Sequence, residues 1–561
     1  MEICFIWVEQ FRNLTDFNLN LSNSVKFQYN SLDNTISKVD ITPLPQSFFG
    51  PSIDEVTGLI GRNGSGKSNA IELICKVLKG AKTSLNTDFI LIVRDGGAFI
   101  CYHSLRNRLD PAKASFSMIF REYEKSINPL KVVYFTNVYN HRKSEFDKEV
   151  ADISINRKPR STKKKEISDF EKQIKFIDSD EFKDLEISLP VEVLFASKVW
   201  TPRPYAGRDY YNVDFSIRDS FDEIRRFLRD RVRKINDTGK FVYTLRYAYF
   251  TDFMAKFVGL GNFGEGFAES LKKFVSDITV RETESATEAL LNFIQDITWK
   301  MPNDLIRKLT DSIGELTSSE AFDLIQKQID FLRDMPGFVQ EILKEHNTEG
   351  ARAKSVDYFR VHYERNGKEF IKHFVALFGE LKDVDVNWVG ISSGEKAYLN
   401  LFSSIRNEIR FTRQPNLLIC IDEGDLYLHP RWQTEFFDRL LLVLPKIYSG
   451  KIQLVLTSHS PFLLSDLPNQ CVTILDTSQT SQSLDGVHLK MKTFGGNLYD
   501  LYAEPFFLGR KRMSDFAYRK ISSLVLALES DSVNKRERAT VGQLVDLIGD
   551  EVIRYKLEKM L

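Results

Sequence analysis

Residues 56–68 read VTGLIGRNGSGKS, an apolar run that leads into a glycine-rich turn ending in Lys67 and Ser68. The run at 56–60 predicts a buried strand, and the apolar positions between residues 69 and 78 predict a helix that is buried over much of its surface. A strand, a GxxxxGK[ST] turn and a helix in this order are typical of a phosphate-binding loop. The sequence therefore predicts an α/β fold with a nucleotide site at this turn.

The residues of the turn contribute to phosphate binding in different ways. Glycines let backbone N–H groups turn toward phosphate oxygens, and the following helix directs the positive end of its dipole at the same anion. Lys67 can reach the β- and γ-phosphates of ATP, and the Ser68 hydroxyl can ligate Mg²⁺. The candidate nucleotide-binding residues of the turn are Gly61, Arg62, Asn63, Gly64, Ser65, Gly66, Lys67 and Ser68.

Two further apolar runs deliver polar side chains at their ends. LLICI at 417–421 is followed by Asp422 and Glu423, and IQLVL at 452–456 is followed by a short polar stretch with His459. Beside a phosphate site, one carboxylate can hold Mg²⁺ and the other can polarise water. A histidine on the next strand can hydrogen-bond the γ-phosphate or the attacking water. We therefore expect Asp422 to bind metal, and Glu423 and His459 to be catalytic.

A small-residue turn opens the helix that is expected to run to about Arg410. It contains Ser392, Ser393, Gly394 and Glu395. Backbone amides at a helix N-terminus can bind an anion, but such a turn is usually a helix cap. Both interpretations stay open at this point.

In their order along the chain, the four motifs resemble those of the ABC ATPase superfamily. They are most similar to its branch of SMC, RecF and OLD-like proteins. The opening Phe11-Arg12-Asn13-Leu14 also resembles the first strand and turn of that branch. The resemblance implies an ABC-type head, with a P-loop parallel sheet and an antiparallel β subdomain, in which two heads sandwich two ATP molecules. It matches 61–68 to Walker A, Asp422 to the Walker B aspartate, Glu423 to the catalytic glutamate and His459 to the switch histidine.

The same resemblance gives the turn with Ser392, Ser393, Gly394 and Glu395 a role between two copies. Its residues match the family's signature motif, so Ser392 and the Gly394 amide would contact the γ-phosphate bound to the opposite protomer. Ser393 and Glu395 depart from the usual glycine and glutamine, although the backbone amides remain. A homodimer is therefore implied, with higher oligomers left open.

Two other family motifs are matched by single residues. Asp425 lies where the family's D-loop begins. Asn137, which follows an expected strand at 132–135, is a candidate for the Q-loop position.

The tail resembles a narrower group. Residues 493–501 and 505–508, with SSGEK and with DEGDLYLHP at 422–430, resemble PtuA-type ATPases of Septu and retron antiphage systems. This resemblance implies a regulatory subunit that controls a partner nuclease through ATP-dependent head closure. The partner would be an HNH nuclease (PtuB-like), and in retron versions also a reverse transcriptase with its RNA–DNA product.

These motifs divide the chain into four parts. Residues 1–150 and 376–500 would form the two halves of the head, separated by a long, mainly α-helical insertion at 151–375. Residues 501–561 would form a helical tail.

Composition narrows the class of protein. The 77 basic and 77 acidic side chains cancel, and the five cysteines form no CxxC pair, which argues against a disulfide framework or a zinc site. The N-terminus has no signal-peptide pattern, and no apolar run is long enough for a membrane helix. We expect a protein of the reducing cytoplasm that does not enter a membrane.

Two segments, 157–165 and 225–234, each hold six basic side chains. Either could contact nucleic-acid backbones without reading sequence, or could be a solvated loop and helix face. Tyr205, Tyr210 and Tyr211 could stack on bases, but ordinary tyrosines at the core or surface are the favoured interpretation.

Two other functions compete with regulation of a nuclease. The first is a RecF/SMC-like ATPase of DNA repair or DNA tethering, which needs no nuclease partner. The second is an OLD-like nuclease with its own Toprim domain, which needs an acidic metal site after His459. Only 102 residues follow that histidine, and they lack a separated Glu and Asp-x-Asp set. We therefore expect an ATPase that is not itself a nuclease.

Overall fold

The computed structural model describes residues 1–62, 64–80, 85–105, 114–123, 126–138, 146, 148–155, 167–201, 215–260, 266–310, 316–350, 355–379, 381–475, 483–503, 513–529 and 535–561.

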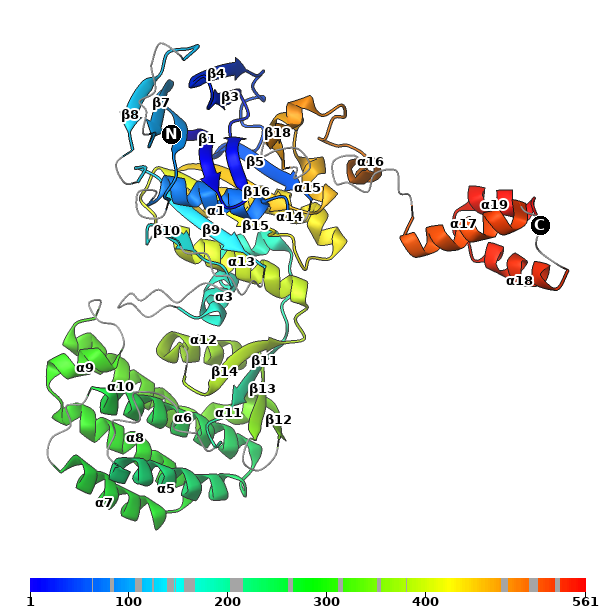
Figure 1. Ribbon diagram of the computed structural model, residues 1–561. Coiled ribbons are helices and arrows are strands. Elements are labelled where there is room, and N and C mark those ends of the chain that lie inside the picture. Colours follow the sequence, from blue (N-terminus) through cyan, green and yellow to red (C-terminus); the bar gives the residue numbers. More distant parts are fainter. Residues whose placement is uncertain are drawn as a thin grey trace.

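A seven-stranded sheet forms the centre of the part of the molecule that contains the turn at 61–68 and His459 (Figure 1). Its order is β10-β9-β15-β16-β5-β17-β18, and every neighbouring pair is parallel except β17–β18. The strands are β5 (Ile53–Gly61), β9 (Lys131–Thr136), β10 (Val150–Asp152), β15 (Asn416–Asp422), β16 (Lys451–Ser458), β17 (Val472–Leu475) and β18 (Ser483–Asp485). The central strands are apolar runs because both faces of the sheet are covered. The expected α/β class is thus confirmed, and the motifs at 61–68, 422–423 and 459 meet at one edge.

A second, mostly antiparallel sheet packs over helix α1 (Lys67–Leu78). Its order is β2-β1-β6-β7-β8, in which only β7–β8 is parallel. The strands are β1 (Glu2–Phe11), β2 (Leu14–Asn20), β6 (Phe89–Asp95), β7 (Ala98–His103) and β8 (Ile119–Glu122), and a separate hairpin joins β3 (Val25–Asn30) to β4 (Thr35–Asp40). Gly96 and Gly97 turn the β6–β7 hairpin with φ of 56° and 86°, as the Asp-Gly-Gly sequence predicts.

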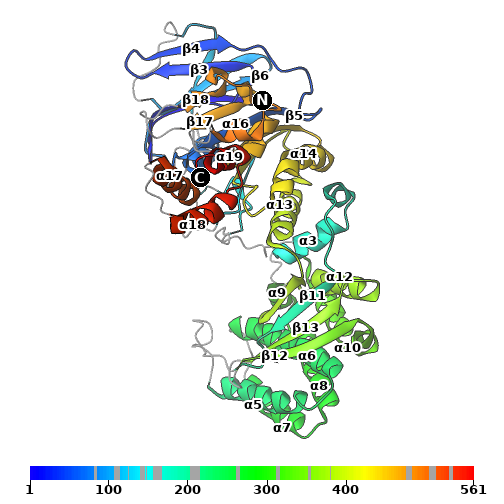
Figure 2. The same cartoon turned by 90° about the vertical axis from the view of Figure 1, so that its right-hand side faces the viewer.

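Residues between the two halves of the large sheet form a separate body of helices (Figures 1 and 2). The helices of this body are α5 (Phe215–Val232), α6 (Asp237–Gly259), α7 (Phe267–Thr279), α8 (Thr283–Lys300), α9 (Asn303–Leu309), α10 (Ser318–Asp334), α11 (Pro336–Ile342) and α12 (Asn366–Phe378). Helix α3 (Asp169–Ile177) and a 3₁₀ turn, η2 (Asp180–Leu185), pack instead against two helices beside the large sheet, at 393–409 and 430–447 (Figure 1). The helical periodicity predicted this body.

The same body also contains a four-stranded antiparallel sheet that the periodicity did not predict. Its order is β12-β13-β11-β14, from β11 (Glu192–Ser197), β12 (Leu343–Glu349), β13 (Val356–His362) and β14 (Val384–Val389). The edge strand β12 is almost entirely polar and exposed, so it carries no strand signal of its own. Because β14 pairs with β11, this body extends beyond the expected boundary at 375.

The remaining helices lie beside the large sheet or form the tail (Figure 1). They are α13 (Ser393–Ile409), α14 (Pro430–Ile447), α15 (Pro461–Asp466), α16 (Leu498–Ala503), α17 (Asp515–Glu529), α18 (Lys535–Asp546) and α19 (Glu551–Glu558), with two 3₁₀ turns, η3 (Asn469–Cys471) and η4 (Gly486–His488). The last three long helices lie apart from the rest of the chain and share a small apolar cluster (Figure 1). The described residues after 513 are therefore largely helical.

Two expectations drawn from composition can be compared with the fold. All five cysteines are buried and free. Across the described ranges, no helix has the length and apolar character needed to span a membrane.

One buried carboxyl in the large sheet should make stability depend on pH. Glu55 on β5 accepts a hydrogen bond of 2.8 Å from the Asn23 backbone N–H, and burial together with the charge of Glu2 raises its pKa. A raised carboxyl pKa in the folded state gives stability that is present at low pH and is lost as pH rises past the ordinary carboxyl value.

We therefore predict that Glu55→Gln raises the melting temperature at about pH 8 and has little effect at about pH 5. The amide of glutamine keeps an acceptor for the Asn23 N–H. It also removes a carboxyl group whose ionisation the buried site disfavours. The expected gain is on the order of 1–3 kcal/mol. Exposed Glu9 on β1 provides the control Glu9→Gln. A thermal-shift series across this pH range checks the prediction, and equal effects at both pH values would contradict it.

Candidate nucleotide site

The glycine-rich turn at 61–68 leaves the end of β5 and leads into α1. Gly64 and Gly66 have φ of 79° and 97°, a left-handed conformation that glycine adopts without steric cost. A side chain at Gly61 would collide with the Leu475 carbonyl oxygen and with the Ser65 hydroxyl. The turn therefore needs glycine at these positions for reasons of geometry, before any ligand is considered.

Lys67 is the first residue of α1, and its ammonium group points back into the turn. Its Nζ donates hydrogen bonds to the carbonyl oxygens of Gly61 at 2.9 Å and Arg62 at 3.2 Å, and lies 3.4 Å from His459 Nδ1. Burial lowers the pKa of Lys67 to about 8, although two nearby carboxylates favour its charged form. Among the described residues, this buried ammonium group has carbonyl oxygens and a histidine as hydrogen-bond partners, so it is well placed to receive an anion.

Asp422 ends β15 at the same edge of the sheet. The parallel register pairs it with Thr457 on β16 and with Thr136 on β9. Its Oδ1 accepts a hydrogen bond of 2.6 Å from the Thr457 hydroxyl, and Ser68 donates a second one. Burial raises the pKa of Asp422, and these hydrogen bonds oppose that effect. The structure thus brings together the two residues expected to hold metal, Ser68 and Asp422.

Glu423 continues from β15 in a left-handed conformation with φ of 50°, which is uncommon for a residue other than glycine. Its backbone N–H donates to the Thr457 hydroxyl at 2.9 Å. Its carboxylate lies 3.1 Å from His459 Nε2, and this hydrogen bond lowers the pKa of Glu423. At Gly424, a side chain would collide with the core, so the sharp turn here depends on glycine.

The contacts of His459 determine which ring nitrogen carries its proton. Nδ1 faces the Lys67 ammonium group, which can only donate, so Nδ1 accepts. Nε2 is then the protonated nitrogen and donates to Glu423. A hydrogen-bonded chain of Lys67, His459 and Glu423 therefore joins the turn at 61–68 to the carboxylate expected to be catalytic.

A second set of hydrogen bonds fixes the loop after Glu423. Ser458 Oγ donates to Asp425 Oδ2 at 2.5 Å and accepts from the Ser460 N–H at 2.8 Å. Ser460 Oγ donates to Gln433 Oε1 at 3.0 Å, and burial raises the pKa of Asp425. The sequence analysis assigned no roles to Thr457, Ser458, Ser460 or Gln433. For Thr457, Ser458 and Ser460, the available signal was a polar stretch at the end of an apolar run, whereas Gln433 lies in helix α14 and had no such signal.

Asn137, the candidate for the Q-loop position, follows β9 and lies beside the turn after β15. Its Nδ2 donates to the Gly424 carbonyl oxygen at 3.2 Å. Its Oδ1 is buried and accepts no hydrogen bond from the described residues. Since a buried amide oxygen is normally paired, this oxygen is available to a water molecule or a cation. The donor set of Ser68, Asp422 and Asn137 suits Mg²⁺, which prefers oxygen ligands.

The turn at 391–395 caps α13. Ser392 Oγ accepts from the Glu395 N–H at 3.2 Å, and the Glu395 carboxylate accepts from the Ser392 N–H at 2.8 Å, which is a capping box. Ser392 and Ser393 are exposed, whereas Gly394 is buried with its Cα facing the Trp432 ring. Within the described ranges, no hydrogen bond joins this turn to the turn at 61–68. The structure therefore contains the expected helix cap, and the role of this turn in nucleotide binding stays a prediction.

The turn between β1 and β2 holds the start of α1. Arg12 donates to Asn69 Oδ1 at 2.7 Å and forms an ion pair of 2.5 Å with Glu72, and Asn69 donates to Asn13 Oδ1 at 2.6 Å. The Phe-Arg-Asn-Leu segment thus positions the helix that carries Lys67.

Several candidates lie outside the described residues. They are Asn63 of the glycine-rich turn, the basic segment 157–165, Tyr205, Tyr210 and Tyr211, and the tail segment 505–508. Among the residues that the structure describes, no group of three or more His, Cys, Asp or Glu side chains could hold a metal ion.

Comparison with known families gives a match over most of the chain. The AAA ATPase domain family matches residues 1–464. This range contains the turn at 61–68, the carboxylates at the end of β15, and His459.

Three curated proteins are similar over shorter stretches. The chain is 25% identical over 194 residues to a protein named "Retron Ec83 probable ATPase" from Escherichia coli, covering 32% of this chain and 34% of that protein. It is 26% identical over 140 residues to "Retron Vc95 probable ATPase" from Vibrio cholerae serotype O1 biovar El Tor, covering 21% and 26%. It is 30% identical over 129 residues to "Septu protein PtuA" from Bacillus mycoides (strain KBAB4), covering 23% and 17%. The matches span about a third or less of these relatives' lengths.

Proposed function

The chain belongs to the AAA ATPase domain family, and on this premise we propose that it binds ATP at the turn 61–68 and hydrolyses it with Glu423 as general base. The observation that carries the proposal is the hydrogen-bonded chain from Lys67 through His459 to Glu423. It connects the cation that faces the phosphates to the carboxylate that accepts a proton from water. The hydrogen bond that lowers the pKa of Glu423 also keeps it ionised and able to act as a base.

Each of the other residues has a part in this proposal. Ser68, Asp422 and Asn137 would hold Mg²⁺, which when bound neutralises charge that develops on the phosphates. Lys67 would exchange its bonds to backbone carbonyl oxygens for bonds to β- and γ-phosphate oxygens. His459 would hydrogen-bond the γ-phosphate or the attacking water once ATP occupies the turn.

We further propose that residues 1–150 and 376–500 form the two halves of an ABC-type head, and that two heads sandwich ATP as a homodimer. The parallel sheet built from both segments supports this head. Ser392 is exposed at the N-terminus of α13, and its described hydrogen bonds lie within its own cap. Such a turn is free to meet the γ-phosphate of a second copy.

The relatives' names support a role in antiphage defence. Because the matches cover a minor part of those proteins, the partners are proposals for this chain. We propose a regulatory subunit that holds an HNH nuclease (PtuB-like) inactive or releases it as the heads close and open. In a retron version, a reverse transcriptase with its RNA–DNA product would also be bound.

Purified protein is therefore expected to hydrolyse ATP and to leave DNA and RNA intact with Mg²⁺ or Mn²⁺. The carboxylates at the end of β15 are engaged at the ATP site, so they are not available for nuclease chemistry. Cleavage should appear only when the partner nuclease is added. A gel assay of labelled DNA and RNA checks this, with nuclease alone as control. Cutting by this chain alone, lost when an acidic residue outside the ATP site is changed, would contradict the proposal.

A further inference from the structure

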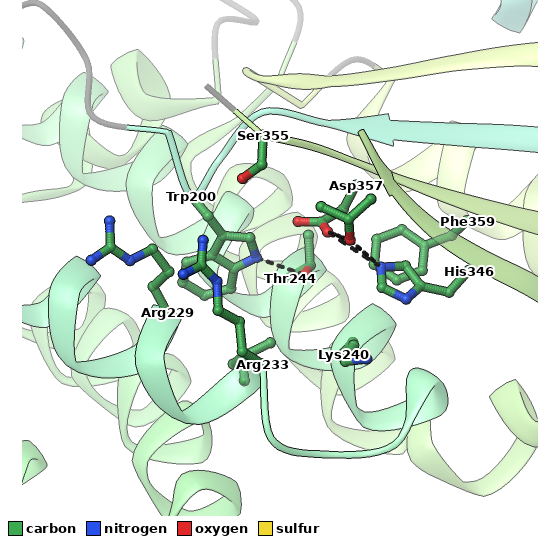
Figure 3. A pocket seen from close by; sticks show the side chains of 11 residues that line it. Trp200, Arg229, Arg233, Lys240, Thr244, His346, Ser355, Asp357 and Phe359 are labelled. Atoms are coloured by element: carbon green, nitrogen blue, oxygen red, sulfur yellow. Dashed lines mark hydrogen bonds and ion pairs between the residues drawn. The ribbon is translucent and has the colours of Figure 1, made fainter. Parts of the chain in front are cut away.

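A cavity of about 140 Å³ lies in the helical body, where the end of α5 and the start of α6 face the strands β12 and β13 (Figure 3). Polar and aromatic side chains line it: Trp200, Arg229, Val232, Arg233, Lys240, Thr244, His346, Thr348, Ser355, Asp357 and Phe359. It belongs to a different body from the turn at 61–68, so ATP binding does not account for it.

Positive charge dominates the lining. Arg229 lies in the last turn of α5, Arg233 follows directly after the helix, where its backbone N–H donates to the Arg229 carbonyl oxygen at 3.3 Å, and Lys240 approaches from α6. Arg233 makes no ion pair or side-chain hydrogen bond with any described residue, so its donors are not used within this part of the protein. Arg229 and Lys240 each have one acidic neighbour on the adjacent surface, Asp230 at 3.3 Å and Asp237 at 2.9 Å.

The acidic residue of the lining, Asp357, is engaged by two other residues of the same lining. Asp357 Oδ1 lies 3.2 Å from His346 Nε2 and accepts a hydrogen bond of 2.7 Å from the Thr348 hydroxyl. His346 stacks on Phe359, with ring centroids 4.6 Å apart. Figure 3 shows Asp357 and His346 on one side of the cavity and the two guanidinium groups on the other. Because the Asp357 carboxylate is held on the His346 side, it does not pair with the two guanidinium groups on the other side of the cavity.

Trp200 gives the cavity a rigid wall. It is buried, donates a hydrogen bond of 3.0 Å from Nε1 to Thr244, and stacks on Tyr247 with ring centroids 4.7 Å apart. The basic segment 225–234 is thus more than a solvated helix face, because two of its arginines line a cavity in which buried Trp200 forms one wall.

The size of the cavity limits what can enter it. The cavity has a volume of about 140 Å³. That space is smaller than the 300–1,000 Å³ or so of typical small-molecule pockets. One compact anionic group fits, and the guanidinium fork matches the oxygens of a phosphate.

We propose that this cavity binds a terminal phosphoryl group, that is, a phosphate monoester. Arg233 and Arg229 would bind its oxygens and Lys240 would add charge. The monoester could belong to a free nucleotide or to the end of a nucleic-acid strand. Both sources share the dianionic group that the basic lining requires.

The test uses the full chain and a fluorescent single-stranded DNA with either a 5′-phosphate or a 5′-hydroxyl. Anisotropy titrations compare wild type with Arg233→Glu, Arg229→Gln and the matched control Arg226→Glu. Arg226 is an exposed arginine of the same helix that does not line the cavity. All variants keep the turn at 61–68, so phosphate bound there contributes equally and ATP hydrolysis is not needed for the readout.

Wild type and Arg226→Glu are expected to bind the phosphorylated strand at least about tenfold more tightly than the hydroxyl strand. Arg233→Glu and Arg229→Gln should lose most of that difference. Competition with inorganic phosphate and with AMP then identifies the source. Displacement of the labelled strand by a competitor at the same concentration as the strand indicates a small phosphate compound. Resistance to displacement indicates a strand end. Equal affinity for both strands in wild type, or equal losses in Arg226→Glu and Arg233→Glu, would overturn the proposal.

Discussion

Replacing Lys67 with alanine is expected to reduce ATP affinity by roughly a hundredfold or more. The change removes the buried ammonium group that would bind the β- and γ-phosphates. Each charge-assisted hydrogen bond contributes about 1.5–3 kcal/mol, and about 1.4 kcal/mol corresponds to a factor of ten in affinity. The shape of the turn should persist, because it depends on the glycines at 61, 64 and 66.

Isothermal titration with Mg·ATP measures this effect. The matched control is Lys76→Ala, which removes a lysine from the last turn of the same helix, where it pairs with Glu72. Lys76→Ala should bind ATP like wild type. Unchanged affinity in Lys67→Ala would contradict the assignment of the turn as the nucleotide site.

Replacing Glu423 with glutamine should leave ATP binding intact and lower the turnover number by about 10²–10⁴-fold. Glutamine keeps the size of the side chain and can still bond to His459, but it cannot accept a proton from water. ATP-bound dimers should accumulate, because closed heads would no longer be released by hydrolysis.

Single-turnover hydrolysis and size-exclusion chromatography with ATP measure the two consequences separately. Glu408→Gln on α13, whose carboxylate pairs with Lys131, removes a carboxylate away from the site and serves as the control. Hydrolysis by Glu423→Gln at the wild-type rate would show that another residue is the base.

The sequence predicts the large sheet and its edge because their signals are local. The apolar runs at 56–60, 417–421 and 452–456 are strands in the structure, and all end at the same edge. The glycines at 64 and 66 report a backbone conformation that few other residues adopt. Short-range constraints of this kind can be read without knowledge of the rest of the fold.

Features that depend on pairing between distant segments were not predictable in the same way. The sheet of the helical body joins β11 to β13 and β14, which lie far along the chain, and each strand alone is short. Asn137 could be named from sequence only as a candidate, because its position beside Gly424 follows from the register of β9 against β15. The hydrogen bonds of Thr457 likewise require the register of two strands.

The most direct measurement of the central claim, an ATP site completed by a second copy of the chain, is the ATPase rate of mixed variants. Lys67→Ala disables one half of each site, and Ser392→Arg blocks the turn expected to complete the site of the other copy. Each variant alone should be almost inactive, whereas an equal mixture should recover about a quarter of wild-type activity, since half of the dimers are mixed and each holds one intact site. No recovery in the mixture, or full ATPase activity from a strictly monomeric Ser392→Arg protein, would contradict the claim.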